Sequence, residues 1–307
     1  MNITISIIIP TKERNDIFEK SLMYVLNAVS KYSYEIIVVN DSKTSCPKIP
    51  ENNGNIKIID NPKSGVASAR NYGAGIAKGD WLLFLDDDML IFEENIKTYL
   101  NYTNRTERFC ANIEWDYPPE LIDKIKTTAF GRFLIRYGFT TMRGWNGNPA
   151  WENKSIIAFH SITSQNLFIR KNHFFETKGY DENFPFAGAE DYVFSKHLNE
   201  SGFIMYIDTT TLMYHNEEDR VKMKYWLKRK ERGGTTMKIA VKQGFLDFEI
   251  KHNLIKKLFY ISAPLTEPLI KFFVFITSSS KYFDFISFKL YKILLGISTN
   301  KGYRKNN

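Results

Sequence analysis

The first hundred residues alternate between short apolar runs and stretches with helical spacing. Residues 3–10 form a β-branched run that ends at a proline and a polar cluster, which predicts a strand followed by a loop. Residues 17–28 place apolar side chains at helical spacing, and residues 34–40 again predict a buried strand. This alternation indicates a parallel βαβ unit.

The alternation continues and places polar residues after each strand. Residues 55–60 predict a third strand, residues 65–77 a helix of small residues, and residues 81–85 a strand apolar enough to be buried on both faces of a sheet. Open α/β sheets bind ligands at the carboxyl ends of their strands. We therefore expect an α/β fold with a doubly wound, mostly parallel sheet flanked by helices and with its ligand loops at one edge.

The fourth predicted strand ends in three consecutive carboxylates, Asp86, Asp87 and Asp88. Adjacent carboxylates repel one another unless a cation neutralises them, and oxygen ligands suit a hard ion such as Mg²⁺ or Mn²⁺. A solvated acidic turn is the alternative interpretation. The buried strand that leads into the triplet favours the metal site, with Asp88 as our first choice of ligand.

A second pair of acids stands at the start of a predicted helix. Glu190 and Asp191 follow the turn-like residues 179–185 and open a helical pattern that continues to Phe203. Acids in a first helical turn are commonly caps, which is the alternative here. A helix N-terminus lowers the pKa of a carboxyl group, so partial burial or a nearby negative charge must offset it if Asp191 is to act as a base.

Two further segments carry candidate residues. Residues 204–207 predict a strand and residues 209–211 a turn before His215, for which a structural role and a metal-ligand role remain equally open. Residues 143–151 are rich in Gly, Asn and Trp. The indole rings of Trp145 and Trp151 could bind a ligand, or the loop could only pack against the protein.

The composition is that of an ordinary folded protein, with 25% charged and 43% hydrophobic residues. Cys46 and Cys110 are too few for a disulfide framework or a zinc site, which favours a reducing compartment. The N-terminal residues lack the basic start of a signal peptide, so we expect none. A disordered chain and a disulfide-rich secreted domain are excluded.

The positive charge is concentrated in the last part of the chain. The net charge is +8, and residues 245–307 hold ten Lys and Arg against four Asp and Glu. Residues 253–261 and 282–295 have amphipathic patterns, and the most apolar piece, residues 269–276, is too short to span a bilayer. Basic, aromatic-rich amphipathic helices lie at a membrane surface or pack on the parent domain; we favour the first and keep the second.

Five motifs occur in one order along residues 3–215. They are Ile-Ile-Ile-Pro-Thr ending at Thr11, Val-Val-Asn-Asp-Ser around Asp41, Gly-Val-Ala-Ser-Ala-Arg-Asn around Arg70, Leu-Phe-Leu-Asp-Asp-Asp ending at Asp88, and Gly-Ala-Glu-Asp ending at Asp191. Together they resemble the family 2 glycosyltransferases with the GT-A fold. One departure is Asn40-Asp41-Ser42-Lys43, where family members often have Asp-Asp-Gly-Ser, so the Asp is kept but the following turn differs.

The resemblance and the strand-end positions together imply a donor site and a divalent metal, Mn²⁺ or Mg²⁺. In this family the pairing of a base N–H with an acid such as Asp41 favours uracil or thymine. The expected metal ligands are Asp88, Asp86 and His215. The expected nucleotide-binding residues are Pro10, Thr11, Glu13, Asp41, Arg70, Asp86 and Asp87, although a surface salt bridge is the alternative for Arg70.

The resemblance also implies an acceptor site. We expect Asp191 to be the general base of a single, inverting displacement, because the other motifs stand in the matching order. The expected acceptor-binding residues are Glu190, Trp145, Trp151 and Asn166, the last by resemblance to a small-residue segment near the donor sugar.

These interpretations predict a metal-dependent, hexosyltransferase-type enzyme. Residues 1–244 would form the GT-A domain, with residues 1–110 binding the nucleotide sugar and residues 111–244 the acceptor, and residues 245–307 a basic helical extension. We expect a UDP- or dTDP-sugar donor and a glycan acceptor in lipid-linked form, for cell-surface polysaccharide synthesis at the inner face of the membrane.

Two other classes of protein are alternatives to this one. A sugar nucleotidyltransferase on a similar sheet would carry a Gly- and Arg-rich phosphate loop after the first strand, where residues 10–15 contain no Gly. A non-catalytic basic module that binds nucleic acid would spread its positive charge with aromatic residues over a sheet face. In this chain the charge lies in apolar helices, and we expect no nucleic-acid partner.

Overall fold

The computed structural model describes residues 4–50, 54–147 and 149–305. Within them the chain forms two compact units. Unit 1 comprises residues 1–116, 149–185 and 190–216, and unit 2 comprises residues 117–148, 186–189 and 217–307. This division differs from the boundary expected after Gly244. Ile3, the expected start of the first strand, and Asn148, in the expected acceptor loop, lie outside the described residues.

Unit 1 is built on a mixed sheet of nine strands among the described residues, in the order β3-β2-β1-β4-β8-β6-β9-β5, with β7 paired to β9. The strands β3, β2, β1 and β4 run parallel, as do β6 and β9, whereas β8, β5 and β7 are antiparallel to their neighbours. The strands are β1 (Ile5–Thr11), β2 (Tyr34–Asn40), β3 (Ile56–Asp60), β4 (Trp81–Leu85), β5 (Met89–Leu90), β6 (Phe109–Asp116), β7 (Ile156–Phe159), β8 (Asn166–Arg170) and β9 (Ile204–His215).

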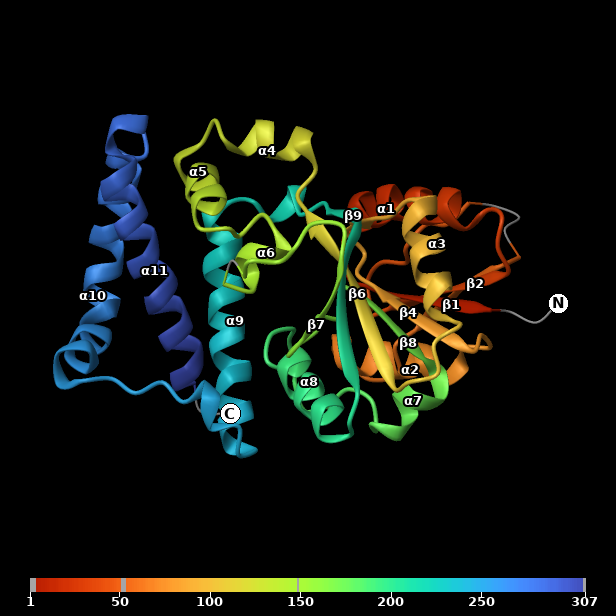
Figure 1. The fold of residues 1–307 in the computed structure, drawn as a ribbon. Helices are drawn as coiled ribbons and strands as arrows, with labels where there is room; N and C mark the ends of the chain where they lie inside the picture. Colours follow the sequence, from red (N-terminus) through yellow and green to blue (C-terminus); the bar gives the residue numbers. More distant parts are fainter. Residues whose placement is uncertain (1–3, 51–53, 148, 306–307) are drawn as a thin grey trace. The chain divides into compact units, whose positions relative to one another are not determined.

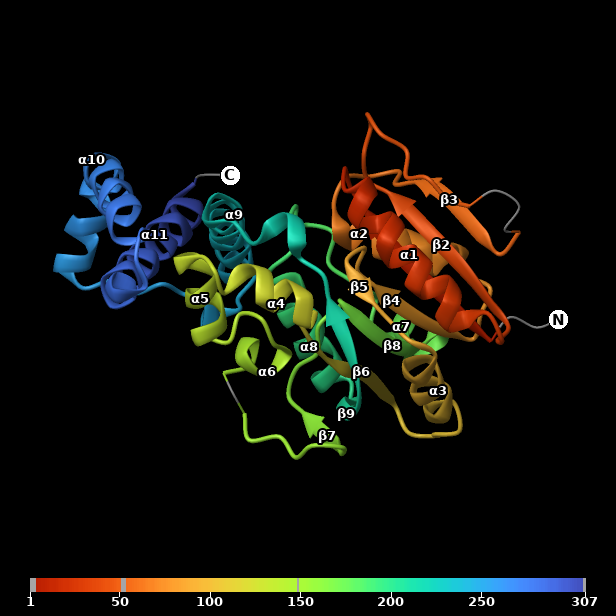
Figure 2. The same ribbon diagram turned by 90° about the horizontal axis from the view of Figure 1, so that it is seen from above.

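Helices cover both faces of this sheet. Figures 1 and 2 show α1 and α3 over one face and α2, α7 and α8 over the other. In α1, the buried residues Phe18, Leu22, Val25 and Val29 recur at intervals of three and four, which is why this segment folds as a helix with one face on the sheet. The helices of this unit are α1 (Asn15–Val29), α2 (Val66–Ile76), α3 (Glu93–Tyr102), α7 (Lys171–Glu176) and α8 (Glu190–Glu200).

The strand β4 is buried on both of its faces, as its uninterrupted apolar sequence predicts. Leu82 and Phe84 belong to the core beneath α2, α7 and α8. Trp81 stacks on Phe168 of β8 with ring centroids 4.8 Å apart. The register pairs Ile8 of β1 with Phe84, so the carboxyl ends of β1 and β4 meet at the same sheet edge.

One expected feature of this unit is wrong. Residues 209–211, predicted to form a turn, lie inside β9, which runs from Ile204 to His215 and changes register against β6 at Ile113/Glu114. β-Branched Thr is favoured in strands, and the register irregularity absorbs the local bend. The strand therefore continues to His215 and delivers its side chain to the sheet.

Unit 2 is helical. Its helices are α4 (Pro119–Ile125), α5 (Ala129–Arg136), α6 (Met142–Trp145), α9 (Met223–Lys242), α10 (Leu254–Thr277) and α11 (Asp284–Arg304), with short 3₁₀ turns at Glu218–Arg220, Leu246–Phe248 and Lys281–Phe283. Within this unit, α11 lies between α9 and α10 (Figures 1 and 2) and packs on both and on α5. Its aromatic core includes Phe130, Phe133, Trp226, Phe288 and Tyr291.

Polar contacts also join the helices of unit 2. Arg132 of α5 and Asp284 at the start of α11 form an ion pair with an N–O distance of 2.6 Å. The buried carboxylate of Glu217 accepts hydrogen bonds from Tyr117 and Arg229. The Arg132–Asp284 pair, with the packing of α11 on α9 and α10, indicates that the last two helices are part of the unit's fold.

The expectation that the tail has no segment long enough to span a bilayer is wrong. Lys256–Thr277 is a continuous stretch of 22 residues, long and apolar enough to cross a membrane by length and composition. Pro264 and Pro268 lie inside α10 without ending it. The expectation rested on residues 269–276 alone, whereas the helix continues through Glu267 and Lys271, which pair with each other on its surface.

Candidate active site

The loop that follows β1 lies against the acidic triplet. Thr11, the last residue of β1, donates from Oγ1 to Asp87 Oδ2 at 2.8 Å. Arg14 Nη1 lies 2.5 Å from Asp87 Oδ1 and 2.8 Å from Asp88 Oδ2. Because all three ionic side chains are nearly fully buried, Arg14 neutralises much of the repulsion between the two neighbouring carboxylates. The sequence reasoning did not single out Arg14, although it belongs to the polar cluster after the first strand.

Arg70 of α2 joins the first residue of the triplet to the start of α8. Its Nη2 lies 2.8 Å from Asp86 Oδ1, and its Nη1 lies 3.5 Å from Glu190 Oε1 and 3.9 Å from Asp191 Oδ1. Burial acts to lower the pKa of Arg70, but Asp86, Asp191, Tyr180 and Glu190 raise it above its ordinary value. Arg70 is buried, so the alternative of a surface salt bridge is wrong.

The Asp191 side chain is partly exposed, and its pKa is shifted. Its side chain is 24% exposed. It accepts hydrogen bonds from the hydroxyl of Ser164 and from the Ser164 backbone N–H, the latter at 3.2 Å. Burial raises the pKa of Asp191, and the opposing effects of Arg70 and Ser164 do not cancel that rise. This is the offset that a base in the first turn of a helix requires.

Asp88 and His215 lie at the ends of two strands of the sheet. His215 Nε2 is 3.2 Å from Asp88 Oδ1, and both side chains are almost completely buried. The backbone carbonyl of Asp88 also accepts from the Asn216 N–H at 2.7 Å. The imidazole packs edge-on against Trp115 at 4.7 Å. The pairing of an antiparallel β5 with β9, Met89 opposite His215, fixes this approach.

These two residues fit a divalent ion. Adjacent ligands of an octahedral ion at about 2.1 Å are separated by about 3 Å, which is close to the separation of the His215 nitrogen and the Asp88 oxygen. A carboxylate oxygen and an imidazole nitrogen are a donor set that suits a metal such as Mn²⁺. Asp86 faces Arg70 instead, so the pairing seen here assigns its carboxylate to that guanidinium.

Asp41 shapes the entrance to α2. Its Oδ1 accepts from the Gly65 N–H at 3.0 Å and from Asn61 Nδ2 at 2.7 Å, and its Oδ2 pairs with Lys12 at 2.9 Å. Gly65 has φ 114°, a conformation that glycine adopts without strain. The carboxylate has further lone pairs, so the expected hydrogen bond to a base N–H stays a prediction.

The remaining donor-side candidates lie at the same loops. Pro10 and Thr11 end β1 and are buried, whereas Glu13 is exposed. The Glu13 carboxylate accepts long hydrogen bonds from Ser42 Oγ and Thr44 Oγ1, both at 3.4 Å. The loops after β1 and β2 are therefore joined through Glu13, despite the departure from the family pattern at Ser42 and Lys43.

The expected acceptor residues lie in different environments. Asn166 is fully buried and bonds to both the N–H and the carbonyl of Ile113 on β6, so it holds the sheet together, and we do not carry it into the acceptor site. Glu190 is 1% exposed and faces Arg70, which gives it the helix-orienting role rather than an acceptor contact. Trp151 is also buried, edge-on to Phe159.

Trp145 belongs to unit 2 and is 39% exposed. Its indole N–H donates to the Phe139 carbonyl at 2.9 Å, and Arg229 lies over its ring at 4.8 Å from the centroid. It therefore keeps an accessible ring surface. Its role with an acceptor stays a prediction.

Ser164 and Tyr180 are site residues that the sequence reasoning missed. Ser164 Oγ contacts both Asp191 and the Tyr180 hydroxyl, the latter at 2.7 Å. The Tyr180 ring lies 5.4 Å from the Arg70 guanidinium. Ser164 stands two residues before Asn166, and Tyr180 was quoted as part of the turn before α8, but nothing in their spacing shows that they meet at Asp191.

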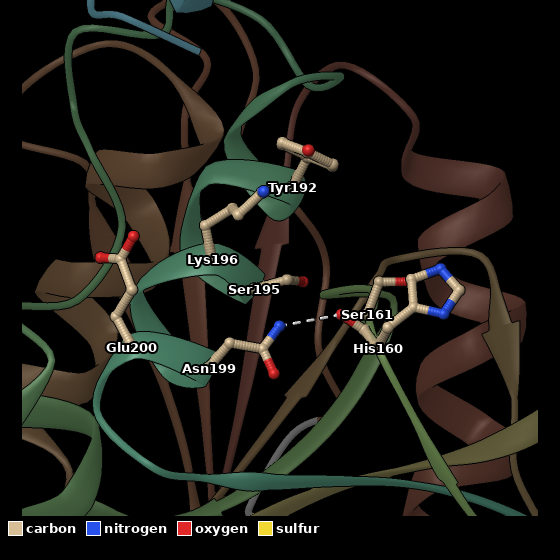
Figure 3. Close-up of a pocket in the computed structure, with 7 residues that line it drawn as sticks. All are labelled: His160, Ser161, Tyr192, Ser195, Lys196, Asn199 and Glu200. Carbon is tan, nitrogen blue, oxygen red and sulfur yellow. Dashed lines mark hydrogen bonds between the residues drawn. The ribbon is translucent and has the colours of Figure 1, made fainter. Parts of the chain in front are cut away.

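A hollow of about 510 Å³ runs along α8 beyond Asp191. Figure 3 shows Tyr192, Ser195, Lys196, Asn199 and Glu200 of α8 on one side and His160 and Ser161 on the other. Asn199 Nδ2 donates to the His160 carbonyl at 3.1 Å across it. The residues that line this hollow do not include those predicted for the site.

Two known proteins resemble this chain over more than two thirds of its length. A chain from Haemophilus influenzae described as an uncharacterized glycosyltransferase is 26% identical over 68% of this chain and 67% of its own length. Chondroitin synthase from Pasteurella multocida is 26% identical over 70% of this chain, which spans only 25% of that longer protein.

Solved structures show the same fold at low sequence identity. A mannosyltransferase from Pyrobaculum calidifontis, in complex with GDP-mannose and Mn²⁺, has a TM-score of 0.57 at 11% identity and covers 100% of this chain and 89% of its own. GalNAc-T7 with UDP, GalNAc and Mn²⁺ has a TM-score of 0.52 at 15% identity, over 70% of this chain and 43% of its own. The fold prediction, a GT-A-like mixed α/β sheet with C-terminal helices, is confirmed.

The family is shown directly by the sequence. The model of glycosyl transferase family 2 matches residues 6–159, which include all of β1 but its first residue, the loop after β1 and the acidic triplet that this loop contacts. The chain therefore belongs to glycosyl transferase family 2.

Proposed function

We propose that this chain transfers a sugar from a UDP- or dTDP-sugar to a hydroxyl group of a glycan, with inversion at the anomeric carbon. Membership of the family makes it a nucleotide-sugar-dependent glycosyltransferase. What we propose beyond this is the catalytic base, the identity of the nucleotide, the dependence on a metal ion and the acceptor. The observation that carries it is the cluster in which Arg70 contacts both Asp86 of the triplet and Asp191, a partly exposed carboxylate whose pKa is raised.

In this proposal, Asp191 removes the proton from the acceptor hydroxyl as its oxygen forms a bond to the anomeric carbon. The bond between that carbon and the diphosphate oxygen breaks, the electron pair leaves with the diphosphate, and the proton stays on Asp191. The hydroxyl and N–H of Ser164 orient the carboxylate. A raised pKa makes the carboxylate a better proton acceptor than an ordinary Asp.

Arg70 positions these groups and does not itself bind the diphosphate in this arrangement. It is buried and already contacts three carboxylates, so its positive charge holds the Asp86 and Asp191 carboxylates close to each other. Asp88 and His215 would hold the divalent ion, which when bound offsets the negative charge of the departing diphosphate. Asp41 and the loop after β1 would receive the nucleotide.

The acceptor class is inferred from the relatives. Chondroitin synthase and an O-antigen biosynthesis protein are among the proteins that match this chain, which supports a polysaccharide or related glycan as the product. The lipid-linked form of the acceptor and a location at the inner face of the membrane belong to the same proposal. A lipid-linked acceptor at that face would bring a hydroxyl group to Asp191 and phosphates to the basic helices of residues 245–307.

A screen of nucleotide sugars tests the proposal. Thermal unfolding is measured with UDP-, dTDP- and GDP-sugars, each with Mn²⁺ and with Mg²⁺. The expected result is that a UDP- or dTDP-sugar raises the melting temperature, since a ligand at a hundred times its Kd stabilises by about 2.7 kcal/mol. If no UDP- or dTDP-sugar stabilises the protein and none is hydrolysed, the proposed donor is wrong.

The products separate this function from the sugar nucleotidyltransferase. A glycosyltransferase releases a nucleoside diphosphate, whereas a nucleotidyltransferase joins a nucleoside triphosphate to a sugar phosphate and releases pyrophosphate. Release of UDP or dTDP from the stabilising donor is therefore the expected outcome. Formation of pyrophosphate from UTP or dTTP would contradict it.

A further inference from the structure

The helix α10 has apolar residues on both of its faces. One face packs within unit 2 through Tyr260, Ala263, Ile270, Val274 and Thr277, which recur at intervals of three, four and seven. The opposite face is exposed and is also apolar. Its residues and exposed fractions are Leu254 72%, Leu258 58%, Ile261 54%, Leu265 84%, Leu269 57%, Phe272 57%, Phe275 79% and Ile276 46%.

A surface helix normally carries polar residues on its outer face. Continuous exposed apolar patches mark a site that binds a protein or a membrane. The exposed row runs from Leu254 to Ile276 of α10, and two more exposed aromatic residues follow in the chain, Tyr282 at 84% and Phe285 at 69%. The face therefore needs a partner.

The charges around this face fit anionic lipid. Lys256 and Lys257 lie in the first turn of α10, and Lys281 follows its end. The two acids nearby are already paired, Glu267 with Lys271 at 2.6 Å and Asp284 with Arg132 at 2.6 Å. Both ends of the apolar face thus present positive charge, which anionic head groups attract.

A second copy of the chain fits this face less well. If two α10 helices paired in parallel, the lysines at their first turns would face each other. If they paired antiparallel, Lys256 and Lys257 of one copy would face Lys281 of the other. Either arrangement brings like charges together, which costs free energy.

The packing of unit 2 decides how α10 meets the membrane. Ser278 bonds to the Tyr291 hydroxyl at 2.6 Å, and Ser287 Oγ donates to Thr277 at 2.9 Å, so the end of α10 is fixed to α11. In turn, α11 packs on α9, which carries the charged run from Lys228 to Arg232. If α10 crossed the bilayer while it kept these contacts, charged residues of α9 would enter the hydrocarbon at a high cost.

We propose that α10 lies flat in the membrane interface, with its face from Leu258 to Ile276 among the acyl chains and Lys256, Lys257 and Lys281 on anionic head groups. Helices of this kind sit about 5–10 Å into the boundary between head groups and acyl chains. The proposal deepens the proposed function, because it places the enzyme at the surface where a lipid-linked acceptor would lie. Vesicle binding can be measured without sugar transfer, so the two can fail separately.

The first test is flotation of the full chain with vesicles. One set of vesicles is phosphatidylcholine alone, and the other is equal parts of phosphatidylcholine and phosphatidylglycerol. The expected result is binding to the second set, which falls at least about tenfold in Leu265→Glu/Phe275→Glu, because two charged side chains replace apolar ones that would be buried among the acyl chains. The matched control is Met23→Glu, which changes an exposed apolar residue of α1 in unit 1.

Donor hydrolysis and circular dichroism of each variant show that the fold is intact. Lys256→Glu/Lys257→Glu should weaken binding to the anionic vesicles. Wild-type protein that stays off both kinds of vesicle, or equal binding of Leu265→Glu/Phe275→Glu and wild type, would overturn the proposal. A dimer that this double variant converts to monomer in light scattering, with flotation unchanged, would show that a second copy covers the face.

A second measurement distinguishes the flat arrangement from a spanning one. Single cysteines at Leu258, Leu265 and Phe272 carry a spin label, in a Cys46→Ser background because Cys46 is exposed. Equal depths of the three labels in the bilayer are expected for a flat helix. Depths that change steadily along the helix would show that α10 crosses the membrane and would overturn the flat orientation.

Discussion

At the scale of single residues, the site depends on how buried charges are paired. Asp191 accepts hydrogen bonds from Ser164 and has a raised pKa, which are the surroundings that our proposal requires of a general base. Replacing it with Asn removes the proton acceptor and keeps the shape. We expect Asp191→Asn to lower the rate of transfer by about 10²- to 10⁴-fold while nucleotide-sugar binding persists.

The measurement compares transfer rate and donor Kd in the variant and in wild type. Glu200→Gln, an exposed acid at the far end of the same helix, is the control and should retain transfer. Equal transfer by Asp191→Asn and wild type would remove Asp191 as the base.

The raised pKa of Asp191 also makes a prediction about stability. Below the pKa of the unfolded chain, about 3.9, the carboxyl group is protonated in both states. As pH rises from there to the higher folded-state pKa, the folded protein binds more protons than the unfolded chain, so its stability falls. Asp191→Asn avoids this loss.

We therefore expect the difference in melting temperature between Asp191→Asn and wild type to shift in favour of the variant as pH rises from about 4 to 7. Thermal unfolding at several pH values measures it. The comparison across pH removes the fixed effect of the altered hydrogen bonds to Ser164. A difference that is constant with pH, or that shifts toward wild type, would contradict a raised pKa.

Arg14 gives a prediction that links charge to metal binding. Its guanidinium contacts Asp87 and Asp88 in a buried cluster, and removal of one partner of a buried pair costs about 3 kcal/mol. We expect Arg14→Gln to lower the melting temperature in EDTA. Mn²⁺ should recover part of that loss, because a bound cation supplies the missing positive charge.

Lys12→Gln is the control, since Lys12 is 53% exposed and pairs with Asp41 instead. Its stability should change little, as is usual for surface ion pairs. A Mn²⁺-induced shift in Arg14→Gln no larger than that in wild type would argue against a metal site at the triplet.

At the scale of elements, the strands that the sequence identified best are those with purely local patterns. The strands β1, β2 and β4 and the helices α1 and α2 were predictable because their apolar spacing alone defines them. The strand β8 was not predicted, because its place between β4 and β6 depends on antiparallel pairing with residues far along the chain. Asn166 at its start was therefore assigned to the acceptor site by resemblance alone.

The same distinction applies to the site. The positions of Asp86, Asp87 and Asp88 after β4 followed from the sequence, but the contacts of Arg14 and Ser164 did not, since these depend on the conformations of loops. The end of β9 was also mispredicted, although His215 itself was identified. Metal-ligand candidates on two distant strands can be named from residue type, and only the sheet register shows that they meet.

The register between β5 and β9 gives a prediction about these ligands. Because His215 Nε2 and Asp88 Oδ1 are 3.2 Å apart, loss of either should weaken Mn²⁺ binding at least about tenfold. Titration calorimetry with Mn²⁺ on His215→Gln and Asp88→Asn measures this. His160→Gln changes an exposed His and should leave the Mn²⁺ affinity unchanged. If all three variants bind Mn²⁺ with the affinity of the wild type, the metal site lies elsewhere.

At the scale of the whole molecule, the basic tail is both a part of unit 2 and a candidate membrane surface. The core of that unit includes Phe288, Tyr291 and Leu294 of α11, packed with Phe133 of α5 and Trp226 of α9. From the sequence alone, binding to a membrane surface and packing on the parent domain are alternatives for these helices. The structure shows packing for the inner face of α10 and for α11, and the exposed outer face of α10 is the surface that we propose binds the membrane.

Truncation after Gly244 therefore removes more than a membrane anchor. It deletes α10 and α11 and exposes the apolar faces of α5 and α9, so we expect unit 2 to lose its stable fold. Hydrogen exchange of α9 amides should become fast in the truncated chain and stay slow in Leu265→Glu/Phe275→Glu, whose changes lie on the exposed face. Slow exchange in the truncated chain would show instead that α9 is held without the last two helices.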